Sequence, residues 1–193
     1  TEIRILPRQR YLNIRDQRQY VGKAVSGYFT DYQRAAEEIA PFDGQASIYC
    51  SLQPCDRKLL RRTDNHLAYD VQHTTSDGQI LGYRWLLLDI DPVRPSDTAS
   101  TDQELQLSAD LLARIKAERL DPQGINLYTA ISGNGMHGLV PIASSLPLDQ
   151  TPTLVKEVLE VLDQEYSTDQ LKVDTSVFNP SRITKVYGTL AIK

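Results

Sequence analysis

Two acidic residues, separated by a single residue, stand at the end of a predicted strand. Residues 83–92 contain a continuous apolar run, typical of a strand buried on both faces, and the run ends with Asp89, Ile90 and Asp91. Alternate strand residues point to one side, so both carboxylates face the same space. Such oxygen donors suit Mg²⁺ or Mn²⁺, and two ions can clamp a phosphoryl transfer. Solvated acids or the DxD pair of a sugar-nucleotide transferase would show the same pattern.

A glycine-containing loop is the second candidate. Residues 132–135 read Ser-Gly-Asn-Gly and separate two segments with strand patterns, 125–131 and 136–142, which predicts a hairpin. Two glycines allow backbone N–H groups to point together at an anion, and a histidine follows on the outgoing strand. An ordinary glycine hairpin and a core histidine are the alternatives. The residues expected to hold nucleotide phosphates here are Ser132, Gly133, Asn134 and His137.

A third group lies nearer the end of the sequence. Asp174 follows a valine that we expect to be buried, and Arg182 and Lys185 stand three residues apart. Arginine can bind a phosphate through two parallel hydrogen bonds, and lysine acts on it as a point charge. An exposed acid and a basic strand edge are the alternatives. Together the three groups would supply metal ligands, an anion site and cations for a triphosphate.

Basic residues are concentrated in two places, although the formal net charge is −4. Residues 1–23 carry six basic and two acidic side chains. The second cluster consists of Arg57, Lys58, Arg61 and Arg62. We expect this second cluster to contact a nucleic-acid backbone, and a solvated helix face is the alternative for either cluster.

The remaining patterns predict the elements that position these residues. Helices are predicted at residues 28–39, 56–67, 101–120 and 148–166, and further strands at residues 46–52, 173–177 and 184–192. Thr101 with Glu104 predicts a capping box, and Asp56 an N-cap. Strands and helices alternate irregularly and include a hairpin. We therefore expect a fold of the α/β (α+β) class built on a mixed sheet, and not a doubly wound fold.

Composition excludes several classes of protein. The sequence has no run of about 18 apolar residues and no apolar signal segment, which predicts a cytoplasmic protein without a membrane partner. The sequence begins with Thr1, so we expect a fragment of a longer chain.

Two cysteines are too few for a disulfide framework. The zinc ligands considered, whose spacing fits no standard module, are Cys50, Cys55, His66 and His73.

Taken together, these motifs resemble the archaeo-eukaryotic primase superfamily, in the primase-polymerase branch found on mobile elements. The resemblance is carried by residues 87–96, residues 132–137, and Asp174 with residues 179–189. Flanking segments are also similar, at residues 27–29, 51–54, 59–62 with Asn65, and 74–77. It therefore covers the chain from about residue 27 onward. Two positions depart from the family pattern: Gln53 stands where relatives typically have Asn, and His66 where Arg is usual.

The resemblance implies a fold of two modules, an N-terminal α/β lobe and an RRM-like lobe. We expect one catalytic domain over residues 1–193, in which roughly residues 1–80 are the N-terminal part with the basic clusters and residues 81–193 carry the catalytic motifs. The active site would lie in the cleft between the lobes. It implies that Asp89, Asp91 and Asp174 bind two Mg²⁺ or Mn²⁺ ions.

The implied function is a DNA primase and DNA polymerase, a template-directed nucleotidyltransferase that releases pyrophosphate. The triphosphate would be held by Ser132, His137, Arg182 and Lys185. Expected partners are single-stranded DNA template and primer, NTP or dNTP, and a helicase domain or other replication factor on the same chain. The alternatives are a DxD sugar-nucleotide transferase and an inactive nucleic-acid-binding module of the same fold.

Overall fold

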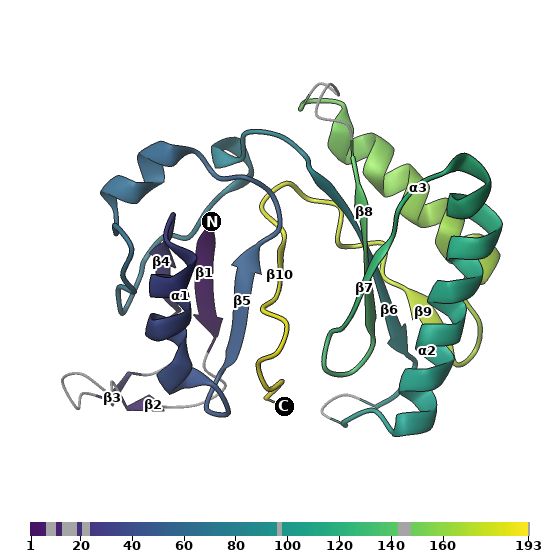
Figure 1. The fold of residues 1–193 in the computed structure, drawn as a ribbon, viewed down its shortest axis with the longest axis horizontal. Coiled ribbons are helices and arrows are strands. Elements are labelled where there is room, and N and C mark those ends of the chain that lie inside the picture. The colour runs from purple at the N-terminus through teal and green to yellow at the C-terminus, as the bar shows by residue number, and fades with distance from the viewer. Residues whose placement is uncertain (7–10, 13–18, 21–23, 96–97, 143–147, 193) are drawn as a thin grey trace. The chain divides into compact units, whose positions relative to one another are not determined.

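The computed structural model describes residues 1–6, 11–12, 19–20, 24–95, 98–142 and 148–192. Two compact units make up this part of the chain (Figure 1). The first unit consists of Thr1–Leu81 and Ser181–Ile192, and the second unit is Gly82–Pro180. The chain therefore passes from one unit to the other twice. Most of the N-terminal basic cluster falls outside the described residues, namely Arg8, Arg10, Arg15, Arg18 and Lys23.

A four-stranded sheet with the order β10-β5-β1-β4 forms the centre of the first unit. Its strands are β1 (Glu2–Leu6), β4 (Val25–Tyr28), β5 (Ser47–Ser51) and β10 (Ile183–Lys185), and all its ladders are antiparallel. The other elements of this unit are β2 (Tyr11–Leu12), β3 (Gln19–Tyr20), α1 (Tyr32–Ile39) and the short 3-10 helices η1 (Ala40–Phe42), η2 (Arg57–Arg61) and η3 (Asp77–Gln79).

The core of the first unit lies between its sheet and α1. Ile3 and Ile5 are two residues apart on β1, so they share a face, and they pack with Ile48 of β5 and Ala35 of α1. The Asp31 side chain accepts a hydrogen bond from the Arg34 backbone N–H, so it caps the first turn of α1. The two inner strands of this sheet, β5 and β1, contribute Ile48, Ile3 and Ile5 to this core.

The second unit has the element order β6-α2-β7-β8-α3-β9. Its elements are β6 (Trp85–Pro92), α2 (Asp102–Ile115), a π-helical turn η4 (Lys116–Leu120), a 3-10 turn η5 (Asp121–Gln123), β7 (Tyr128–Ile131), β8 (Met136–Pro141), α3 (Thr151–Tyr166) and β9 (Leu171–Val173). The strand order is β7-β8-β6-β9, with every ladder antiparallel. Figure 1 shows α2 and α3 on the same side of this sheet.

Alternation along β6 separates two kinds of side chain. Leu86 and Leu88 line an apolar cavity of about 370 Å³ together with Ile115 of α2 and Leu162 of α3, so they face the helices. The residues between them point the other way, because successive strand residues alternate. We call the opposite side of the sheet the acid face, because it carries Asp89 and Asp91.

Several predicted elements are confirmed, namely β5, β6, the β7–β8 hairpin, α2 with its Thr101 and Glu104 capping box, and α3. The chain is not doubly wound, as expected, and it mixes helices with two four-stranded sheets. The expected mixed sheet is wrong, because every ladder between the described strands is antiparallel. None of the helices in the described part of the chain is long and apolar enough to cross a membrane.

Other boundaries differ from the prediction. The helix expected at 28–39 begins only after Asp31, because Phe29 donates its backbone N–H to the carbonyl of Thr1 and extends the sheet. The helix expected at 56–67 begins after the Asp56 cap but ends as η2, and Asn65 has a positive φ of 52°. In both segments the helical pattern in the sequence covers more residues than the helix that forms: the first pattern begins too early and the second ends too late.

Two late strands also differ. The strand expected at 173–177 lies instead at Leu171–Val173, because the Asp174 carboxylate accepts the Ser176 N–H and forms a turn. The last strand, expected at 184–192, is only Ile183–Lys185, and the turn after it includes Gly188 at φ 89°. Strands β1 and β4 were not predicted at all.

Candidate functional site

Asp89 and Asp91 lie on β6, an inner strand of its sheet. β6 pairs with β8 on one side and β9 on the other. Asp89 is directly opposite His137 of β8, and Asp91 is opposite Lys172 of β9. Paired residues of neighbouring strands share a face, so Asp89 and His137 project together on the acid face. The sheet register therefore brings together an acid and a histidine that are 48 positions apart in the sequence.

The carboxylate of Asp89 is incompletely satisfied. Its Oδ1 atom is buried and accepts no hydrogen bond from the residues that the structure describes. The Nε2 atom of His137 lies 3.3 Å from this oxygen, which is close enough for an ion pair but outside hydrogen-bond geometry. The His137 residue is itself only 5% exposed. A buried oxygen without a donor is unfavourable unless a cation or another ligand approaches it.

Asp91 lies in an environment that disfavours its charged form. Burial raises the pKa of Asp91, and the negative charges of Asp89 and Asp174 raise it further. Arg94 and His137 act in the opposite direction. Asp89, Asp174 and His137 therefore lie close enough to Asp91, at this end of the sheet, to affect its charge. A positive charge placed among the acids would relieve their repulsion.

Asp174 stands next to Asp89 through the backbone. Immediately after β9, the Asp174 N–H donates to the carbonyl oxygen of Asp89 at 2.8 Å. Its carboxylate accepts from the N–H of Ser176 at 2.7 Å and from the Ser176 hydroxyl at 3.1 Å. Among the described residues, no group of three His, Cys, Asp or Glu side chains is arranged to hold one metal ion. The convergence of the Asp89, Asp91 and Asp174 carboxylates on one pair of metal ions therefore stays a prediction.

The glycine loop packs directly against Asp91. The Ser132 N–H donates to the Gly135 carbonyl at 3.0 Å, and the Gly135 N–H donates to the Ser132 hydroxyl at 3.1 Å. Gly133 has a φ of 109°. A Cβ atom at Gly135 would lie 2.3 Å from the Ile90 carbonyl oxygen and 2.4 Å from Asp91 Oδ1. Only glycine fits here, and the hydroxyl of Ser132 is used to close the loop.

Two residues that the sequence analysis did not assign hold this loop in place. The Arg94 Nη1 atom donates to the carbonyls of Pro92 and Asn134, both at 3.2 Å. The Ser100 hydroxyl donates to the Asn134 carbonyl, and the Ser100 N–H donates to Asn134 Oδ1 at 3.3 Å. The Asn134 side chain therefore binds the segment before α2. Arg94 lies within residues 87–96, one of the segments that carry the resemblance, but its hydrogen-bond partners become visible only in the folded chain.

Arg182 and Lys185 belong to the first unit, whereas the acids and the glycine loop belong to the second. The Arg182 carbonyl accepts from the Leu52 N–H, which joins β10 to the end of β5. Lys185 is buried, and its Nζ atom donates to the Leu190 carbonyl at 2.6 Å. Burial lowers the pKa of Lys185. The ammonium group of Lys185 thus has a structural partner within its own unit.

The predicted nucleic-acid cluster is exposed. All four of its side chains lie at the surface on or just after η2, while Leu59 between them is buried. In the part of the chain that the structure describes, no carboxylate forms an ion pair with Arg57, Lys58, Arg61 or Arg62. Arg62 Nη1 donates to the Tyr28 hydroxyl at 3.3 Å. The cluster thus presents positive charge to solvent.

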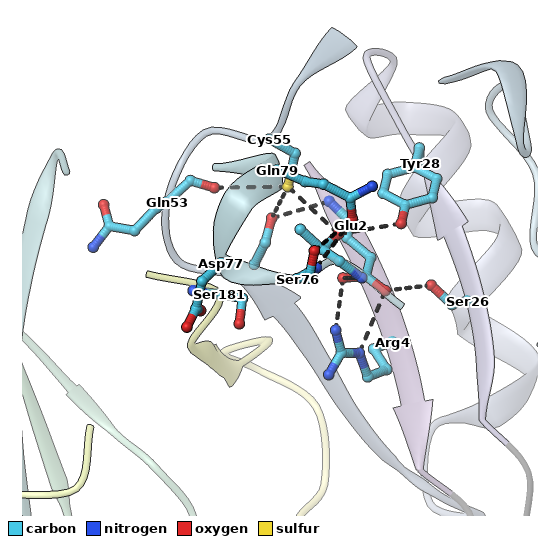
Figure 2. A network of polar contacts seen from close by, with 12 residues as sticks. Glu2, Arg4, Ser26, Tyr28, Gln53, Cys55, Ser76, Asp77, Gln79 and Ser181 are labelled. Carbon is cyan, nitrogen blue, oxygen red and sulfur yellow. Dashed lines mark hydrogen bonds and ion pairs between the residues drawn. The ribbon is translucent and has the colours of Figure 1, made fainter. Parts of the chain in front are cut away.

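A second acidic centre lies inside the first unit (Figure 2). Glu2 is fully buried, and its carboxylate accepts from Arg4 Nη2 at 2.8 Å and from the Ser26 hydroxyl at 2.6 Å. The Thr75 N–H donates to it at 3.3 Å. The Glu2 N–H in turn donates to the Ser51 hydroxyl at 3.0 Å. Each carboxylate oxygen of Glu2 therefore has a donor.

The cysteines lie near this centre, and among the described residues they belong to no group of three or more His, Cys, Asp or Glu side chains that could hold a metal ion. Cys55 Sγ donates to the Ser51 hydroxyl at 3.2 Å. Burial raises the pKa of Cys50 to about 11, so its thiol stays protonated near neutral pH. His66 is exposed, and its Nδ1 atom lies 3.1 Å from the Asp64 carbonyl.

The candidate residues thus fall into two sets. The acids, His137 and the glycine loop form one continuous site in the second unit, whereas the basic cluster, Arg182 and Lys185 lie in the first unit. No protein-family model, no curated protein and no solved structure matches the chain.

Proposed function

We propose that the chain is a template-directed nucleotidyltransferase of the primase-polymerase kind, which joins nucleoside triphosphates into a DNA strand and releases pyrophosphate. The observation that carries this proposal is the arrangement at the end of β6. Two acids face the same side, one of them has a buried oxygen without a hydrogen-bond donor, and a third acid follows the adjacent strand. This is an environment that favours a cation.

The donor set fits hard divalent ions such as Mg²⁺ or Mn²⁺. Asp89 and Asp91 would hold the ions, and Asp174 would add a third carboxylate, because an oxygen that accepts from Ser176 keeps a second lone pair. When bound, such ions lower the pKa of an attacking 3′-hydroxyl and neutralise charge on the phosphates. The raised pKa of Asp91 supports this assignment, because burial and, to a smaller extent, the neighbouring acids disfavour its charge, and a bound cation would offset both.

The protein's own groups would position the triphosphate. His137 lies beside Asp89, so a protonated ring would place a positive charge next to the phosphates. The Ser132–Gly135 turn is held against Asp91, and the backbone N–H groups of Gly133 and Asn134 would bind an anion there. Arg94 keeps that turn in register with β6 through its bond to Asn134.

The topology of the second unit also supports the proposal. The order β-α-β-β-α-β with strands arranged β9-β6-β8-β7 is that of the ferredoxin-like or RRM-like fold. We therefore assign the second unit to the RRM-like lobe of the archaeo-eukaryotic primase fold. The first unit, with its exposed basic cluster, would be the N-terminal lobe that contacts the template.

The test is primer extension on a single-stranded DNA template with Mg²⁺ or Mn²⁺. The variants Asp89→Asn and Asp91→Asn should abolish extension, because amides cannot replace the charge of the metal ligands. Asp110→Asn is the matched control: Asp110 is an exposed acid on α2 of the same unit. Extension should need both a template and a divalent ion.

Three results would contradict the proposal in different ways. Wild-type protein that binds DNA without extending a primer under any divalent ion would be a nucleic-acid-binding module. Transfer from a nucleotide sugar without DNA would indicate a sugar-nucleotide transferase. Extension that survives both acid substitutions would place the active site elsewhere.

A further inference from the structure

An aromatic pair shares the acid face with the candidate site. The rings of Trp85 and Tyr128 meet edge to face, with centroids 5.7 Å apart and an interplanar angle of 88°. Tyr128 is 56% exposed although it lies in a strand. The proposed phosphate chemistry uses neither ring.

The sheet register places these rings on the same side as the acids. Tyr128 is opposite Leu139, and Leu139 is opposite Leu87. Leu139 stands two residues from His137, and Leu87 stands two residues from both Asp89 and Trp85. Residues two apart on a strand share a face, so both aromatic residues project on the acid face.

The distance between the two features suits a nucleotide. Tyr128 lies two strands and two residues away from Asp89. With strands about 4.8 Å apart and about 3.4 Å per residue, the two Cα atoms are roughly 12 Å apart. A base attached to a phosphate held at the acids, or its neighbour in a strand, can span this distance.

The pair is also preorganised and accessible. Among the described strands, β7 pairs with β8 alone and lies at the edge of the sheet, so the Tyr128 ring can be approached from that edge. The edge-to-face contact with Trp85 holds the Tyr128 ring in place, which reduces the entropy lost on binding. A rigid, exposed ring beside a phosphate site is a stacking surface that accepts any base.

We propose that Tyr128, supported by Trp85, is a stacking site for a nucleobase whose phosphates are held at the Asp89 and Asp91 end of the sheet. The inference rests on the proposed function and names the part of the site that binds the base. The base can belong to a DNA strand or to the incoming nucleoside triphosphate, and the chemistry of stacking is the same for both.

The sequence supplies its own reporter for this site. Trp85 is the only tryptophan in the chain, so intrinsic tryptophan fluorescence comes from this position alone. The protein would be titrated, with Mn²⁺ present and each probe added alone, with a short oligothymidylate and with an abasic strand of equal length. Thymidine triphosphate and inorganic triphosphate form the second pair of probes. Fluorescence anisotropy of labelled strands gives the same affinities independently of Trp85.

We expect quenching by at least one of the two base-containing probes and none by the probes that lack a base. Tyr128→Ala should weaken binding of the quenching probe about ten-fold, since one stacked base contributes about 1.4 kcal/mol. Binding of the abasic strand should not change. Tyr128→Phe should retain the affinity because it keeps the ring. Tyr32→Ala removes a tyrosine that is 73% exposed on α1 and should have no effect. Whichever base-containing probe quenches identifies the source of the base.

The inference is overturned if neither base-containing probe binds more tightly than its base-free partner, or if Tyr128→Ala binds as tightly as the wild type. A melting curve for Tyr128→Ala that matches the wild type excludes unfolding as the cause of a loss. Because each probe is added alone and no primer is present, this test is independent of primer extension. Base-dependent binding by a protein that cannot extend a primer would refute the proposed function and leave the stacking site standing.

Discussion

Glu2 in the first unit and Asp89 in the second are both withdrawn from solvent, yet their surroundings differ. Glu2 accepts hydrogen bonds from Arg4, Ser26 and Thr75, and both of its oxygens have donors. Asp89 has a buried oxygen without a donor, and Asp91 close by has a raised pKa. A carboxylate whose partners are all supplied by the fold stabilises the fold. One that lacks them is available to a ligand.

The largest effect should follow from breaking the satisfied carboxylate. Glu2→Ala leaves the largely buried Arg4 guanidinium without its ion pair and removes the acceptor of Ser26 and Thr75. Removing one partner of a buried pair costs about 3–5 kcal/mol. Denaturant unfolding should show a loss of that size, whereas Asp89→Asn should cause little or no loss. An equal loss in both variants would remove the distinction between the two acids.

Adding a divalent ion should further distinguish Asp89 and Asp91 from Glu2. A ligand that binds only the folded state adds about 2.7 kcal/mol when its concentration is 100 times the Kd. Thermal melts of the wild type should therefore rise with Mn²⁺, and melts of Asp89→Asn and Asp91→Asn should not. Glu2→Gln serves as the comparison and should keep the response to Mn²⁺. A rise that persists in the two aspartate variants would indicate binding elsewhere.

The contact between the glycine loop and Asp91 can be tested by adding one methyl group. Gly135→Ala would push a Cβ against the Ile90 carbonyl and the Asp91 carboxylate, and overpacking of this kind costs about 1–3 kcal/mol. Gly78→Ala is the control, because no heavy atom outside its chain neighbours lies within 4 Å of its Cβ position. Denaturation midpoints compare the two. If Gly135→Ala unfolds at the wild-type midpoint, the loop does not pack as described.

The smallest effect concerns a buried cation in the first unit. Burial lowers the pKa of Lys185 in the folded state, so the unfolded state binds more protons between the folded pKa and the usual value. Stability should therefore rise as the pH increases through this alkaline window. Denaturant midpoints for Lys185→Met should lack that contribution when compared with the wild type at each pH. Parallel pH curves for the two proteins would show that Lys185 is not buried as described.

The sequence predicted the second unit better than the first, and the reason is the length of the patterns. The apolar run of β6, the hairpin glycines and the amphipathic helices α2 and α3 each follow a clear rule. β1 was missed because the face opposite Ile3 and Ile5 carries Glu2, a buried charged residue that accepts hydrogen bonds from another strand and from a loop. Local periodicity carries no information about such partners.

The candidate site shows the same division. The acids and the glycine loop could be named from their spacing, because a strand alternates and glycines permit tight turns. The contacts of Arg94 and Ser100 with Asn134 join residues 40 and 34 positions apart. Likewise, Tyr128 became a candidate only when the register placed it on the same face as Asp89.

The return of the chain to the first unit has a consequence for the order of folding during synthesis. Gly82–Pro180 is continuous, so the second unit can fold once its last residue leaves the ribosome. The first unit begins earlier but needs β10, which pairs with β5 through residues 183–185. Until β10 arrives, one edge of β5 has no strand beside it and can pair with another nascent chain. Of the two units, the one whose synthesis begins first is therefore completed last.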